Sequence, residues 1–195
     1  MKNTNKMSTK VIVLCAIMTA LVLLLQLMGA SIRFGQFSIS LVLIPIVVGT
    51  ATCGVWAGAW LGLVFGLAVL MSGDAAAFLA VNVPGTILTV LAKGIACGAF
   101  SGLVYKLLEK HNRYAAVIAA AVVCPLVNTG VFLLGCLLFF METVSVWAAE
   151  AGLGADVGRY MIFFMVGANF IFEFLLNVFV SPVIVRLINI RNKQY

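Results

Sequence analysis

Charged side chains are scarce in this sequence. They make up 9% of the 195 residues, whereas hydrophobic residues make up 64%, and the mean hydropathy is +1.20. A soluble domain carries about 25% charged residues, so this balance excludes an ordinary soluble protein and indicates an integral membrane protein. The net charge is +6, but the basic residues flank apolar runs and form no basic face interleaved with aromatics. We therefore expect the lipid bilayer, and not nucleic acid, as a partner.

The sequence also lacks the usual marks of a catalytic site. Its one histidine, His111, lies in a basic turn, and it has neither a G-x-x-x-x-G-K-[ST] phosphate loop nor a G-x-S-x-G nucleophile motif. The five cysteines lie in apolar runs without a C-x-x-C pair, which is typical of small buried hydrophobic side chains. We therefore expect no enzyme, no cofactor, no metal site and no ATP hydrolysis through a phosphate loop.

The apolar runs predict an all-α membrane protein whose single domain covers residues 1–195, with a leader at 1–9. The uncharged stretch Leu41–Met71 would be about 46 Å long as one helix, against a hydrocarbon core of about 30 Å. We divide it into two short helices that turn between Thr50 and Gly54, because this places most basic residues on one side of the membrane together with both termini. Lysine and arginine collect on the cytoplasmic side. The prediction is a six-transmembrane-helix bundle with both termini cytoplasmic, and the helices cover about 10–29, 39–53, 54–71, 83–110, 113–140 and 159–190.

Glycines recur at intervals of four in two of these helices. Gly58 and Gly62 lie in the third helix, and Gly94 and Gly98 lie in the fourth. Such stripes allow close backbone approach, either between the two helices, which we favour, or to a partner protein.

Lys93 is the most informative residue. It lies about 14 Å below Pro84 in a predicted helix, near the bilayer midplane, where a lysine costs roughly 2.5 to 3.5 kcal/mol on insertion scales. One hypothesis is an ion pair with Glu173 that fixes helix register. The other is that Lys93 receives an anionic or carbonyl group of a ligand, with Asn128 and Asn169 supplying hydrogen bonds.

Other candidates lie in the segments between helices and at one helix face. Arg33 and Trp147 could cap a site from outside, or they could be ordinary interfacial anchors, and the apolar patch around Phe78 could act as a lid. Pro125 interrupts the fifth helix and frees backbone carbonyls that need other partners. A small-residue pair in the first helix, formed by Ala16 and Ala20, allows another helix to approach.

The sequence combines six predicted helices in under 200 residues, a basic leader that runs into the Ala16 and Ala20 pair, and outer loops after helices one, three and five. This combination resembles the S component of an energy-coupling factor (ECF) transporter. The resemblance covers nearly the whole chain. It implies a subunit of the bacterial cytoplasmic membrane that binds a vitamin or related micronutrient at the outer face. It also implies a transmembrane coupling subunit and two cytoplasmic ATPases as partners, which would explain the missing phosphate loop.

The same resemblance implies roles for residues of this chain. Ala16 and Ala20 would contact the coupling subunit, and the loops Ser31–Ser40 and Ser72–Asn82 would form the gate, with Asn82 at the end of the second loop. The expected substrate-binding residues are Lys93, Asn128, Asn169, Glu173, Arg33, Asn82 and Trp147. Two rival functions remain. One is a self-sufficient secondary carrier or channel, although no inverted repeat of broken helices is visible. The other is an intramembrane enzyme or assembly factor, for which Glu173 and Asn177 on one helix face would have to be catalytic or metal-binding.

Overall fold

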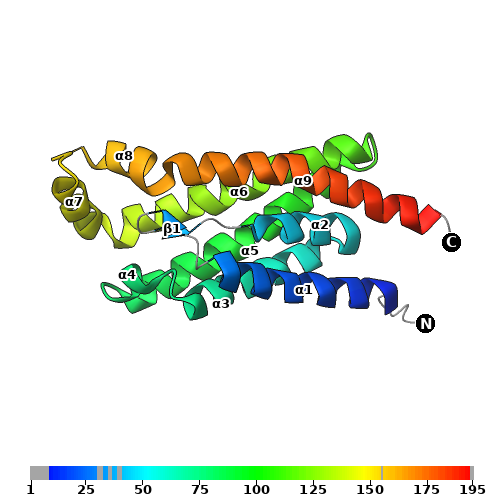
Figure 1. The fold of residues 1–195 in the computed structure, drawn as a ribbon, viewed down its shortest axis with the longest axis horizontal. Helices are drawn as coiled ribbons and strands as arrows, with labels where there is room; N and C mark the ends of the chain where they lie inside the picture. The colour runs from blue at the N-terminus through cyan, green and yellow to red at the C-terminus, as the bar shows by residue number, and fades with distance from the viewer. Residues whose placement is uncertain (1–8, 30–32, 35–36, 39–40, 155, 194–195) are drawn as a thin grey trace.

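The computed structural model describes residues 9–29, 33–34, 37–38, 41–154 and 156–193. In chain order the elements are α1 (Thr9–Gly29), β1 (Arg33–Phe34), β2 (Phe37–Ser38), α2 (Leu43–Cys53), α3 (Val55–Ser72), α4 (Ala76–Leu79), α5 (Val83–Leu108), α6 (Arg113–Phe139), α7 (Met141–Glu150), α8 (Val157–Tyr160), the π-helix η1 (Met161–Val166) and α9 (Gly167–Lys193). The two short strands pair antiparallel. Figure 1 shows the long helices side by side along one axis. The helices α4, α7 and α8 lie at one end of the bundle, the α4–α7 end, while the start of α1 and the end of α9 lie at the other, the terminal end.

The described helices include four that are long and apolar enough to cross a membrane, namely α1, α3, α5 and α6. The α8–η1 segment and α9 form a fifth candidate span that is bent by 44°. The helix α2 has 11 residues and is about 16 Å long, shorter than a hydrocarbon core of about 30 Å. The chain is therefore a helical membrane protein with four or five candidate spans in its described part. The count of six depends on α2 and stays a prediction.

The chain turns sharply between α2 and α3. Gly54 has a φ of 96°, a conformation that suits glycine, and its N–H bonds to the carbonyl of Thr50 at 3.0 Å. The turn lies inside the interval Thr50–Gly54 that length and charge asymmetry predict. Because α2 is folded back by this turn, its side chains enter the middle of the bundle, where Ile46, Val47 and Val48 are buried.

The helices α3 and α5 are in direct backbone contact. A Cβ added to Gly62 would overlap the carbonyl oxygen of Gly94, and one added to Gly94 would overlap that of Gly62. At the next crossing, a Cβ on Gly58 would lie 2.6 Å from the carbonyl oxygen of Gly98. The interpretation that the two glycine stripes pack against each other is therefore confirmed.

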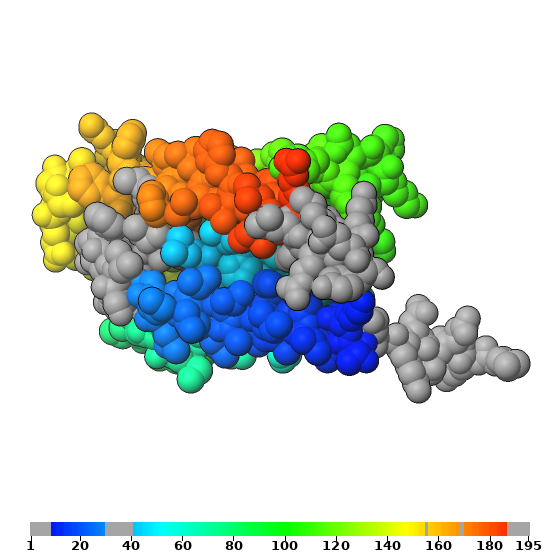
Figure 2. Space-filling view, turned by 45° about the vertical axis from the view of Figure 1, so that its right-hand side comes forward, coloured from blue at the N-terminus to red at the C-terminus, as the bar shows by residue number. Residues whose placement is uncertain are grey.

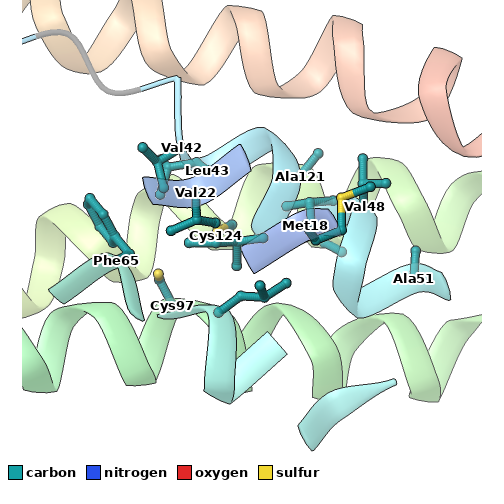
Figure 3. Packing of buried hydrophobic residues seen from close by; sticks show 14 of the residues in the cluster. Met18, Val22, Val42, Leu43, Val48, Ala51, Phe65, Cys97, Ala121 and Cys124 are labelled. Carbon is teal, nitrogen blue, oxygen red and sulfur yellow. The ribbon is translucent and has the colours of Figure 1, made fainter. Parts of the chain in front are cut away.

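The core lies where α1, α2, α3, α5 and α6 converge. Figure 3 shows Val22 of α1 close to Val42 and Leu43, with Phe65 of α3 and Cys97 of α5 flanking them. These five side chains are at most 2% exposed. The buried cysteines thus contribute packing in this core, as their apolar surroundings in the sequence predict.

The helix α1 covers the surface of the bundle. Figure 2 shows it in blue along one face, with part of α2 visible between it and α9. Its inner face buries Met18 and Val22, whereas Ala16 and Ala20 are exposed. The small-residue pair of α1 is therefore not used to pack this helix within the chain.

Candidate functional site

Lys93 lies where α3, α5 and α6 meet. Its Nζ is 5.4 Å from the ring centroid of Phe65 on α3 and 5.4 Å from that of Phe132 on α6. Cation–π contacts of this kind contribute about 0.5 to 2 kcal/mol, depending on desolvation. The ammonium therefore lies between two aromatic rings, one from each neighbouring helix.

The glycine contact sets this geometry. Lys93 directly precedes Gly94, and Phe65 directly precedes Gly66, whose added Cβ would lie 3.0 Å from the carbonyl oxygen of Val90. Because the backbones of α3 and α5 touch, Phe65 can reach the lysine of the neighbouring helix without an intervening side chain. The stripe thus brings an aromatic ring to a half-buried charge.

Two polar side chains that flank Lys93 each carry a buried atom for which the described residues provide no hydrogen-bond partner. Thr89, one turn before Lys93 on α5, is 5% exposed, and Asn128, one turn before Phe132 on α6, is 7% exposed. The hydroxyl of Thr89 and the amide oxygen of Asn128 are buried and unpaired in the described part of the chain. Gly135 leaves room for Thr89, because a Cβ at this position would overlap the threonine side chain.

The helix α9 carries Asn169, Glu173 and Asn177 at intervals of four residues, and the last two have different surroundings. Asn177 donates a hydrogen bond from Nδ2 to the carbonyl oxygen of Ala121 at 2.9 Å, and Ser181 donates to Oδ1 of Asn177 at 2.8 Å. Ala121 lies four residues before Pro125, which has no N–H to offer it. The prediction that Pro125 frees a carbonyl in need of another partner is confirmed, and Asn177 supplies that partner. Glu173, one turn before Asn177, is 6% exposed and belongs to neither of these hydrogen bonds.

Aromatic side chains close the α4–α7 end. Phe78 of α4 meets Phe132 edge-to-face at 5.7 Å between ring centroids, Phe140 at 5.0 Å and Trp147 of α7 at 5.4 Å. The short helices on both sides of the bundle end are thus joined through one ring. Because Phe132 also faces Lys93, a continuous set of rings leads from this end to the lysine.

The remaining candidate residues have different surroundings. Asn82 is the N-cap of α5, and its Oδ1 accepts a hydrogen bond from the N–H of Gly85 at 3.0 Å. Arg33 belongs to β1 and Asn169 to α9, but their side chains lie outside the described residues. Trp147 is partly buried against Phe78, the residue around which the sequence predicts a lid.

Sequence reasoning did not single out Phe65, Thr89, Phe132 or Phe140. Two of these positions carried a usable signal, since Thr89 and Phe132 lie one helical turn from the predicted residues Lys93 and Asn128. Phe65 carried none, because it is one of 14 phenylalanines in a mostly apolar chain. Within the described ranges, no three His, Cys, Asp or Glu side chains are grouped to hold a metal ion.

The long apolar helices and the buried polar groups between them define a multi-pass helical membrane protein. The family model for the ECF transporter, substrate-specific component, matches residues 10–185, which is most of the chain. The chain therefore belongs to this family of substrate-binding transport subunits, in agreement with the resemblance described above. Comparisons with curated proteins and with solved structures give no significant match.

Proposed function

We propose that this chain captures a small vitamin-like substrate at the α4–α7 end of the bundle. In this proposal, it delivers the substrate inward together with a transmembrane coupling subunit and two cytoplasmic ATPases. The observation that carries the proposal is the Lys93 ammonium between Phe65 and Phe132, in a chain of the substrate-specific family. A lysine within a span is costly, so a binding role accounts for its presence there. The chain itself performs no chemistry on the substrate.

The charge distribution supports an orientation with the terminal end in the cytoplasm. Basic residues gather in the helix ends at the terminal end of the bundle (Figure 1). They are Lys10 in α1, Lys106 and Lys110 near the end of α5, and Arg186 in α9. The positive-inside rule then favours an outside position for the α4–α7 end. In this proposal, the membrane is the plasma membrane of a bacterium. Substrate would enter past Phe78 and Trp147.

In this proposal, one group of residues binds the substrate and another contacts the coupling subunit. The substrate is bound near Lys93 and Asn128, with Glu173 and Asn169 on α9 and with Arg33, Asn82 and Trp147 toward the outside. The coupling subunit packs on the exposed pair Ala16 and Ala20 of α1, where small side chains allow a helix to approach closely.

The test is an affinity purification of the tagged chain from its native membranes in mild detergent. Mass spectrometry should find two ATPases and one further membrane subunit, and denaturation should release a small molecule in stoichiometric amount. If the purified chain alone moves substrate across liposomes without these partners, it is a self-sufficient carrier and the proposal is wrong.

A further inference from the structure

Three polar groups form a row between α5 and α6. The helices α5 and α6 run antiparallel, with Lys93 opposite Phe132 and Thr89 opposite Gly135. Along the bundle, Asn128 is therefore one helical turn closer to the terminal end than Lys93 is. Thr89 is one helical turn closer to the α4–α7 end. The row spans about 11 Å along the bundle axis.

The hydrogen-bonding capacities in this row are specific. A lysine ammonium donates only, whereas the unpaired atom of Asn128 is a carbonyl oxygen, which accepts only. The hydroxyl of Thr89 can do either. A molecule that satisfies the row must therefore offer an acceptor to Lys93 and an N–H or O–H donor to Asn128.

The unpaired oxygen of Asn128 selects the type of group that Lys93 can bind. A deprotonated carboxylate could accept from Lys93 but offers no N–H or O–H to Asn128, whereas a ring carbonyl beside a ring N–H satisfies both residues with adjacent atoms. The faces of Phe65 and Phe132 on either side of the lysine favour a planar, apolar body.

We propose that the Lys93 site recognises a neutral planar heterocycle in which a ring carbonyl adjoins a ring N–H, that is, a lactam or cyclic imide. The carbonyl accepts from Lys93, the ring N–H donates to Asn128, and the hydroxyl of Thr89 binds a further polar group of the same molecule. This inference rests on the proposed function, because it takes the Lys93 site as the substrate site.

Three small probes of similar size test the proposal: 2-quinolone, its N-methyl derivative and quinoline-2-carboxylate. The full chain is reconstituted in nanodiscs after removal of any bound ligand, and thermal shift is measured with each probe at millimolar concentration. We expect 2-quinolone to raise the unfolding temperature by several degrees, and each of the other two to shift it at least threefold less. Equal or larger shifts with quinoline-2-carboxylate or with N-methyl-2-quinolone, or no shift with 2-quinolone, would overturn the proposal.

A pair of threonine variants separates binding from folding. Thr50, 0% exposed on α2, has an unpaired hydroxyl like that of Thr89 but lies at Gly58 and Gly102, more than one turn from Lys93 along α5. Both T50V and T89V remove an unsatisfied hydroxyl and should fold at least as well as the parent chain. Only T89V should weaken the binding of 3-hydroxymethyl-2-quinolone, by about tenfold, because its added hydroxyl lies beside the ring carbonyl and can reach Thr89, whereas 2-quinolone itself has no group left for this residue. Equal affinities for T89V and the parent would remove Thr89 from the site.

Failure of this inference and failure of the proposed function give different results. If ATPases and a coupling subunit co-purify with the chain but the probes fail to discriminate as stated, the ligand chemistry is wrong and the transport role stands. If the probes discriminate but no ATPase co-purifies, the ligand site stands without the proposed energy source.

Discussion

Gln26 near the end of α1 donates a hydrogen bond from Nε2 to the carboxylate of Asp74, in the segment between α3 and α4. The same nitrogen lies 3.3 Å from Oγ of Ser72. Gln26 is 3% exposed, so this contact is part of the interior. It ties the helix that carries Ala16 and Ala20 to the segment that carries Phe78.

This contact predicts a link between α1 and substrate retention. Q26L removes the hydrogen bond while keeping an apolar side chain of similar size, and it leaves the Asp74 carboxylate with one donor fewer, at a cost of about 1 to 3 kcal/mol. We expect bound substrate to dissociate at least fivefold faster, because the segment before Phe78 is held less firmly. Stopped-flow displacement of the co-purified ligand measures the rate. S72A is the control, since it removes the longer contact to Gln26 and the bond from Oγ to the Val69 carbonyl but leaves the Asp74 contact in place, and it should change the rate less.

The role of Lys93 can be tested against the ion-pair hypothesis. K93M keeps a long flexible chain, removes the charge and should lower substrate affinity at least tenfold while the protein still folds. If Lys93 and Glu173 serve only as a structural pair, each single change (K93M or E173Q) destabilises the fold and the double variant recovers part of the loss. Calorimetric unfolding and ligand titration of all three variants distinguish these outcomes, and unchanged affinity in K93M would contradict a ligand role.

The contact between α3 and α5 predicts that even a methyl group at Gly62 or Gly94 will destabilise the fold. G62A and G94A each place a methyl group against a backbone carbonyl, which no side-chain rotation can relieve, and we expect a loss of about 1 to 3 kcal/mol or more. Fluorescence-detected gel filtration of the detergent-solubilised variants reports the folded fraction. G130A on α6 is the matched control, because a Cβ there meets nothing within 4 Å. It should behave like the parent.

Pro125 and Asn177 form a testable pair. N177L should cost about 1 to 3 kcal/mol, because the carbonyl of Ala121 and the hydroxyl of Ser181 both lose a partner. In a P125A background, the new N–H at position 125 can bond to the Ala121 carbonyl within α6, so the same N177L change should cost less. Thermal unfolding of the four proteins in one detergent gives the coupling. A cost of N177L that is independent of Pro125 would contradict the assigned role.

The exposed alanines of α1 carry the partner prediction. A16L combined with A20L should prevent co-purification of the coupling subunit, because larger side chains keep its helix at a distance. Substrate binding should stay within twofold of the parent value, since both positions lie outside the site. A92L, at an exposed alanine of α5, is the control and should retain the complex. Normal recovery of the complex with the double α1 variant would place the coupling surface elsewhere.

Apolar length and charge asymmetry were sufficient to predict an all-helical membrane protein and the turn at Gly54. Regular spacing was sufficient to predict the glycine contact, and the chemistry of proline predicted a free carbonyl near Pro125. The helix α7 was missed, because Met141–Glu150 is too mixed in polarity to resemble a span and was assigned to a loop. The ring contacts of Phe78 could not be foreseen either, since they join positions far apart in the chain that local periodicity does not connect.

The direct contact between Gly62 and Gly94 gives the proposed site one fixed wall, because backbone meets backbone there with no side chain between them that could change rotamer. We expect Phe65 and Lys93 to keep their relative position when substrate binds. Any opening should then come from the opposite side, where Phe132 contacts Phe78 and, through it, α7. Substrate size would be limited by how far α6 can move away from α3 and α5.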